Sequence, residues 1–258
     1  MPDFAKTLLE RNNALFYFGL ANLLFSLVFL LLTQFTTAQV LGVNAWYKPF
    51  KFAASIGIYA WTMAWFCAYL PASFNINLFN TAIIVLLGFE IVYIVLQAGR
   101  GQLSHFNQSL AIYAGLYSLM ALAASLVSLY TAYVGWLFFT NAFPQLPDYY
   151  LWAIRWAIVL FVVFSFEGFV MGARLSHTIG GPDGGPGLPL LNWSYRYGDP
   201  RIAHFIGMHA LQVLPLLAYY ALKDVRAVTV AAILYGILAV FTLVQALNGR
   251  ALWNGGAL

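Results

Sequence analysis

Four ionisable side chains fall inside long apolar segments of this chain, where a charged group is costly and normally marks a functional site. They are Glu90, Arg155, Glu167 and His209. Carboxylate oxygens and imidazole nitrogens can bind a divalent metal ion, and both groups can also bind a proton. The sequence therefore makes Glu90, Glu167 and His209 candidate metal ligands, whereas Arg155 is typical of a residue that extends its head group to the membrane interface.

Two segments repeat one order of polar residues: a Glu inside an apolar run, an Arg at the end of that run, and then Leu-Ser-His. The residues are Glu90, Arg100 and His105 in the first copy, and Glu167, Arg174 and His177 in the second. We interpret the Arg and His of each copy as candidate catalytic residues that orient a substrate. The histidines could equally well cap loops, and the short similarity could be chance.

Further basic residues lie near the same span ends. Lys48 and Lys51 share one helix face, three residues apart. With Arg201 and His204 they form a candidate site for an anionic cofactor or substrate, and the alternative for the lysines is anchoring to lipid headgroups. His204 and His209 are five residues apart, about 140° around a helix, so at most one of them is expected to bind a given ion.

The depth of the polar residues in the membrane supports a shared site. With a rise of about 1.5 Å per residue, Glu90 lies about 15 Å, Glu167 about 10 Å and His209 about 12 Å below the arginine at its own span end. Gln97 shares a face with Glu90, and Gln212 lies one turn from His209. We therefore predict that the two carboxyl groups and the imidazole converge near one leaflet.

The elements that must position these residues are transmembrane helices. Of the residues, 62% are hydrophobic and 8% are charged, whereas a soluble domain carries about 25% charged residues. Runs long enough to cross about 30 Å of hydrocarbon predict about seven spans, at Ala14–Thr36, Phe50–Leu70, Ile76–Gln97, Leu110–Phe139, Tyr150–Ala173, Ile202–Leu222 and Ala227–Leu247. The expected fold is an all-α, polytopic membrane helical bundle, a single transmembrane domain over residues 1–258. If the repeated pattern is real, spans three and four and spans five and six are duplicated hairpins.

The longest hydrophilic segment, His177–Arg201, lies between spans five and six. Its Gly and Pro residues exclude a regular helix and favour turns. Its aromatic residues Trp193, Tyr195 and Tyr197 favour an ordered lid over a polar cavity rather than a flexible linker.

Membrane orientation follows from the basic residues, which concentrate on the cytoplasmic side of membrane proteins. Four lie on the side of the N-terminus, and seven lie on the side of the C-terminus: Lys48, Lys51, Arg100, Arg174, Arg196, Arg201 and Arg250. We expect an outside N-terminus and an inside C-terminus, in a bacterial inner (plasma) membrane. No basic cluster typical of nucleic-acid binding is present, and the expected partners are membrane lipids and a small or lipid-like ligand.

The Arg-Leu-Ser-His pattern and the Gly-Pro-Asp that follows it in the second copy loosely resemble helix-end segments of four-helix, haem-handling membrane proteins such as haem A synthases. The resemblance covers only these short segments and implies a haem site. We assign the chain to no family on this basis.

Four hypotheses follow. The first is a membrane-embedded enzyme that uses a divalent metal or another cofactor, with Glu90, Glu167 and His209 as ligands. The second is a small proton- or ion-coupled transporter, although no span is clearly broken near its middle by Gly-Pro. The third is a haem protein with His105 or His177 and His209 as axial ligands, and the fourth is a structural subunit whose polar groups hold helices together.

Overall fold

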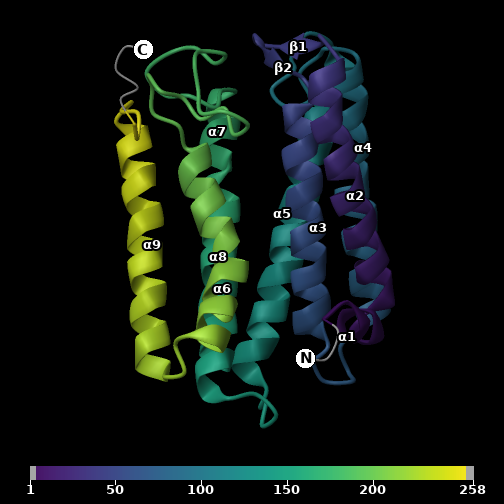
Figure 1. The fold of residues 1–258 in the computed structure, drawn as a ribbon, viewed down its shortest axis with the longest axis vertical. Helices are drawn as coiled ribbons and strands as arrows, with labels where there is room; N and C mark the ends of the chain where they lie inside the picture. Colours follow the sequence, from purple (N-terminus) through teal and green to yellow (C-terminus); the bar gives the residue numbers. More distant parts are fainter. Residues whose placement is uncertain (1–3, 254–258) are drawn as a thin grey trace. The chain divides into compact units, whose positions relative to one another are not determined.

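The computed structural model describes residues 4–253, and its regular elements are almost entirely helical (Figure 1). Six stretches of these residues are long and apolar enough to cross a membrane. The expected all-α, polytopic membrane bundle is confirmed. The described residues form two compact units, unit 1 up to Tyr130 and unit 2 from Thr131.

Unit 1 begins with a short helix, α1 (Phe4–Arg11), which the apolar pattern did not predict. Three long helices follow: α2 (Asn13–Phe35), α3 (Tyr47–Cys67) and α4 (Ile76–Gly99). The side chains of Asn12 and Asn75 cap α2 and α4 by accepting hydrogen bonds from the backbone N–H of Leu15 and Leu78. These helices correspond to the first three predicted spans.

Helix α3 differs from the other predicted spans in composition. It has 21 residues, which is long enough to cross the hydrocarbon, but it is not among the six apolar stretches. Lys48 and Lys51, together with its tyrosines, tryptophans and threonine, lower its mean hydropathy. It packs closely on α2, where Gly19 leaves room for Trp61: a Cβ at Gly19 would lie 2.3 Å from Trp61 Cδ1. Small residues at such contacts are typical of membrane helix pairs.

Between α2 and α3 the chain forms a hairpin of β1 (Gln39–Val40) and β2 (Val43–Asn44). The turn residues Leu41 and Gly42 both have positive φ, 52° and 75°, as a tight hairpin turn of this kind requires. This hairpin was not predicted from the sequence.

Helix α5 (Ala111–Thr140) contains the boundary between the two units. Unit 2 continues with α6 (Asp148–Glu167), α7 (Phe169–Arg174), α8 (Arg201–Tyr220) and α9 (Val225–Leu247). Helices α6, α8 and α9 pack side by side (Figure 1) around buried Phe164, Ala203 and Ala239. The fifth predicted span is confirmed as one apolar stretch, Asp148–Arg174, within which α6 and α7 meet at Gly168.

The segment between α7 and α8 contains no helix, as its glycines and prolines predicted. Isolated β-bridges join Ile179 to Gly198 and Gly187 to Ser194. The rings of Trp193 and Trp253 stack with centroids 6.3 Å apart. This segment and Trp253, which follows α9, therefore lie at the same end of unit 2, as the two spans α8 and α9 between them require.

Candidate functional site

The most unusual buried group in unit 2 is Glu167, the last residue of α6 before the interruption at Gly168. Its side chain is 4% exposed, and its Oε2 lies 3.5 Å from His204 Nδ1 on α8. Within the described residues, neither carboxyl oxygen has a hydrogen-bond partner, and neither does His204 Nδ1. The pair therefore lies at contact distance without a well-formed hydrogen bond.

Two glycines allow α6 and α8 to approach closely enough for this contact. A Cβ at Gly168 would lie 3.1 Å from His204 Cε1, and a Cβ at Gly207 would lie 2.0 Å from Phe164 Cγ. Gly168 has a helical φ of −51°, so space and not conformation demands glycine there. Its N–H donates a hydrogen bond to Ser165 O at 3.2 Å. This bond reaches back three residues, as in a 3₁₀-helix, whereas the regular α-helical bond reaches back four.

His209, one of the predicted metal ligands, has different neighbours. Its Nδ1 lies 3.1 Å from Gln212 Oε1, and its ring packs on Phe205 with centroids 4.3 Å apart. The sequence grouped Glu167 with His209, whereas the contact that the structure contains is between Glu167 and His204. Among residues 4–253, no group of three or more His, Cys, Asp or Glu side chains could hold a metal ion.

Glu90 belongs to unit 1 and Glu167 and His209 to unit 2, so the predicted convergence of all three stays a prediction. In its own unit Glu90 is 7% exposed, and its Oε1 has no hydrogen-bond partner within the described residues. Lys48, in the first turn of α3, is close enough to act electrostatically on Glu90. Lys48 Nζ also lies 5.8 Å from the centre of the Phe52 ring.

The remaining candidates of unit 1 lie around the start of α3 and the loop after α4. Lys51 is half-buried on α3, and Arg100 is exposed where α4 ends. The His105 ring packs against Phe52 and Tyr117, with centroids 5.5 and 5.9 Å away.

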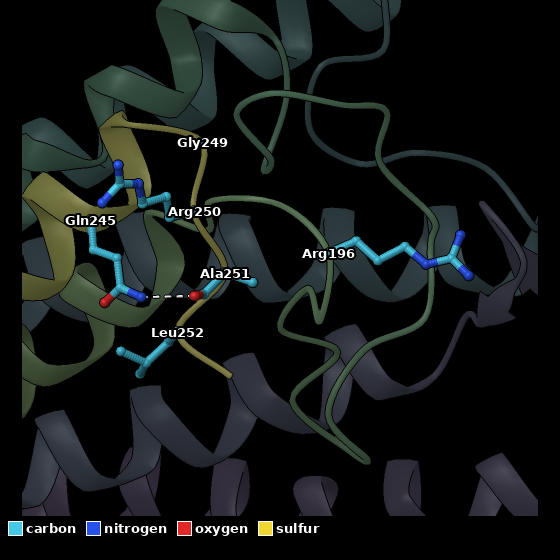
Figure 2. A pocket seen from close by; sticks show the side chains of 6 residues that line it. All are labelled: Arg196, Gln245, Gly249, Arg250, Ala251 and Leu252. Carbon is cyan, nitrogen blue, oxygen red and sulfur yellow. Dashed lines mark hydrogen bonds between the residues drawn. The ribbon is translucent and has the colours of Figure 1, made fainter. Parts of the chain in front are cut away.

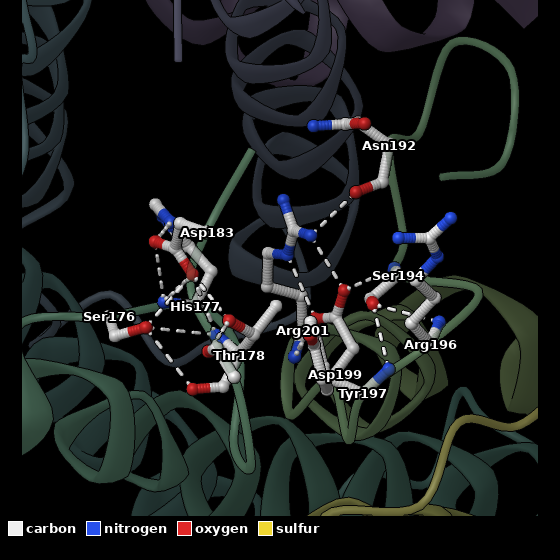
Figure 3. Close-up of polar contacts among 11 residues, drawn as sticks. Ser176, His177, Thr178, Asp183, Asn192, Ser194, Arg196, Tyr197, Asp199 and Arg201 are labelled. Atoms are coloured by element: carbon white, nitrogen blue, oxygen red, sulfur yellow. Dashed lines mark hydrogen bonds and ion pairs between the residues drawn. The ribbon is translucent and has the colours of Figure 1, made fainter. Parts of the chain in front are cut away.

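The second Leu-Ser-His copy is fixed by a carboxylate that the sequence analysis did not single out, Asp183 (Figure 3). Asp183 accepts hydrogen bonds from the backbone N–H groups of His177 and Thr178, from the hydroxyls of Ser176 and Thr178, and from His177 Nδ1 at 2.9 Å. Burial raises the pKa of Asp183, but the hydrogen bonds and charge of His177 and the hydroxyl of Thr178 outweigh it and hold that pKa well below its usual range. His177 therefore orders the loop, and Arg174 before it is exposed.

A second buried carboxylate, Asp199, holds the other end of the same loop (Figure 3). Its side chain is fully buried. Arg201 Nε and Nη2 donate to its two oxygens at 2.8 and 2.6 Å, and Ser194 N donates at 2.9 Å. Arg201 Nη2 also donates to Asn192 O at 2.6 Å. Arg201, a predicted cofactor-binding residue and the first residue of α8, thus forms a bidentate ion pair with Asp199.

A polar cavity of about 590 Å³ lies between this loop and the end of α9. It is lined by Arg196, Gln245, Gly249, Arg250, Ala251 and Leu252 (Figure 2). The guanidinium groups of Arg196 and Arg250 point away from each other in this view. The cavity therefore does not concentrate positive charge on one ligand.

Sequence reasoning missed Gly168, Asp183 and Asp199. A glycine inside a helical apolar run, such as Gly168, usually has a packing or functional reason. An Asp within a Gly-Pro-rich segment, a few residues from Ser or Thr, is likewise typical of a side chain that accepts loop hydrogen bonds.

Comparison of the chain with protein-family models, with curated proteins and with solved structures gives no match.

Proposed function

We propose that this membrane protein is a small proton-coupled transporter and that Glu167 and His204 form its proton-binding pair. One observation carries the proposal: a buried carboxyl group within the membrane span Asp148–Arg174 lies 3.5 Å from an imidazole, and its oxygens have no hydrogen-bond donor within residues 4–253. Ionisable groups in such positions mark ion pathways and proton relays in membrane proteins.

The chemistry of the pair supports proton binding. A carboxylate and a neutral imidazole at contact distance can share one added proton, which converts the pair into a neutral acid beside an imidazole or into an ion pair. Neither group is committed to a strong structural hydrogen bond. In contrast, the nearby Asp183 and Asp199 are saturated with donors.

The helix junction beside Glu167 also supports transport. A short stretch of 3₁₀-type hydrogen bonds within a helix often marks a functional hinge. Helices α6 and α7 meet at Gly168, immediately after Glu167, and the Gly168 N–H donates to Ser165 O at 3.2 Å. A small movement of α7 relative to α6 would change the surroundings of the carboxyl group directly.

The alternatives have less support. A metal-dependent enzyme with Glu90, Glu167 and His209 as ligands requires three converging groups, and no such group is found among the described residues. A haem site with His177 as axial ligand would compete with the bond from His177 Nδ1 to Asp183. Elemental analysis and the visible absorption spectrum of the purified protein would identify either cofactor. The transported species, in our proposal, is a small or lipid-like molecule that reaches the loop face.

The proposal can be tested without a known substrate, because protons themselves are the ligand. Proteoliposomes adsorbed on a solid-supported membrane are exposed to a rapid drop in pH. Proton binding to a buried pair moves charge within the membrane, and we expect a transient current from the wild-type protein. Glu167→Gln removes the titratable group and should abolish most of this current.

The matched control is Glu10→Gln, the same substitution at an exposed residue of α1. This variant should keep the wild-type current. A Glu167→Gln protein that inserts normally and gives the full wild-type current would contradict the proposal.

A further inference from the structure

A line of three buried polar residues runs along one face of α4 in unit 1. Glu90, Tyr93 and Gln97 follow each other at spacings of three and four residues, which places them on the same helix face. They are 7%, 6% and 0% exposed. The line begins inside the span and ends at the last turn of α4, next to the loop that contains Leu103.

The hydrogen bonds along this line are incomplete. Gln97 Nε2 donates to Tyr93 Oη at 3.3 Å and to Leu103 O at 3.1 Å. Within the described residues, Gln97 Oε1 and Glu90 Oε1 are buried acceptors without a donor. Buried polar atoms in proteins are satisfied by protein groups or by ordered water, so both oxygens are suited to accept hydrogen bonds from buried water molecules.

The surroundings favour water and protons over a metal cation. Lys48 from α3 acts electrostatically on Glu90, and its positive charge would repel a cation. Tyr113 from α5 and Arg100 at the end of α4 act on Tyr93. Positive charge thus lies at Lys48 and Arg100, the two ends of the line. Phe52, Leu116 and Met120 form its apolar walls.

We propose that Glu90 is a second proton-binding site, connected to the loop at the end of α4 by water molecules held along Tyr93 and Gln97. In one exchange, the carboxyl proton passes to a water molecule and a proton from that side returns, so that no net charge moves. The Tyr93 hydroxyl can accept one proton while it donates its own, and the Gln97 amide oxygen holds the water in place. This site lies in unit 1 and does not depend on the role of Glu167.

Infrared spectroscopy of the full-length protein in lipid bilayers tests this site with D₂O as the probe. The C=O stretch of a protonated carboxyl group shifts when its proton is replaced by deuterium. Burial favours the protonated form of a carboxyl group, so in spectra recorded between about pH 5 and pH 8 we expect a carboxyl band that is absent in Glu90→Gln. In Gln97→Leu the band should remain, but its shift in D₂O should be about tenfold slower, a change that corresponds to about 1.4 kcal/mol in the barrier.

Three controls make the result decisive. Gln34→Leu, at an exposed position of α2, should exchange at the wild-type rate. Tyr93→Phe keeps the ring and should also slow the exchange, which provides a second test if Gln97→Leu does not fold. Glu167→Gln should leave the Glu90 band unchanged, so that failure of the transport proposal is distinguishable from failure of this one. A Glu90→Gln spectrum identical to wild type throughout this pH range, or wild-type exchange rates in both path variants, would overturn the inference.

Discussion

The buried carboxyl groups of unit 2 differ in the number of hydrogen bonds that their oxygens accept. Asp183 and Asp199 accept hydrogen bonds from several backbone and side-chain donors, as expected of carboxylates that fix a loop. Among residues 4–253, the polar neighbour of the Glu167 carboxyl group is His204 Nδ1, at 3.5 Å, and the carboxyl oxygens have no hydrogen-bond partner. Asp183 and Asp199 therefore serve the structure of the loop, whereas no such set of donors holds Glu167 among the described residues.

Asp183→Asn tests the loop assignment. Burial raises the pKa of Asp183, but the hydrogen bonds from His177 and Thr178 lower it by more, so the net pKa lies below its usual range. The ionised side chain therefore stabilises the folded loop. This stabilisation is complete above about pH 4, the ordinary pKa of Asp, and is lost as the pH falls below it. Hydrogen bonds to a charged group contribute about 1.5–3 kcal/mol, so the variant should exchange the amide protons of residues 176–183 at least about tenfold faster at neutral pH.

Hydrogen-exchange mass spectrometry measures this change, and Asp148→Asn, at an exposed residue in the first turn of α6, is the control. Unchanged protection of residues 176–183 in Asp183→Asn would show that this carboxylate does not hold the loop.

The neighbour of Glu167 could not be predicted from the sequence. The depth calculation assumed a rise of about 1.5 Å per residue and predicted that Glu167 converges with Glu90 and His209. The contact that the structure contains is between Glu167 and His204 on α8, and the convergence of the three groups stays a prediction. The types of the residues were informative, but their pairing depends on helix geometry that no local pattern encodes.

At the scale of elements, the apolar runs predicted the long helices well, because a span needs about 20 apolar residues and few other structures do. Helix α4 was predicted as Ile76–Gln97 and is Ile76–Gly99. The hairpin at residues 39–44 and helix α1 were missed. Both are too short to produce a periodic signal, and the hairpin depends on the positive φ of Leu41 and Gly42.

Gly207→Ala tests the packing of α6 on α8. The added Cβ would lie 2.0 Å from Phe164 Cγ, so the helices must separate or Phe164 must move. Overpacking of this kind costs about 1–3 kcal/mol, and thermal unfolding in detergent should show a lower Tm. The same separation should move His204 away from Glu167 and reduce the current after a pH jump.

Gly88→Ala in α4 is the matched control, since a Cβ there meets nothing within 4 Å. It should leave stability unchanged or raise it by up to about 1 kcal/mol, through helix propensity. If both variants unfold at the same temperature, the close approach of α6 and α8 does not limit stability.

At the scale of the molecule, each unit contains one buried glutamate that faces a basic residue from the first turn of another helix. Glu90 has Lys48 of α3, and Glu167 has His204 of α8. Large apolar side chains such as Leu27 and Ile237 are 58% exposed on the long helices, as expected of surfaces that face lipid. The inner-membrane location and the inside C-terminus remain predictions, as does the duplication of hairpins.

The measurement that tests the central claim most directly is a double-variant cycle on the pH-jump current, with Glu167→Gln, His204→Ala and the combined variant. Two residues that bind one proton together act as a unit, so their effects are not additive. We predict that each single variant abolishes most of the current and that the double variant loses no more than either. Independent, additive losses, or a wild-type current in His204→Ala, would contradict the claim that Glu167 and His204 form one proton-binding pair.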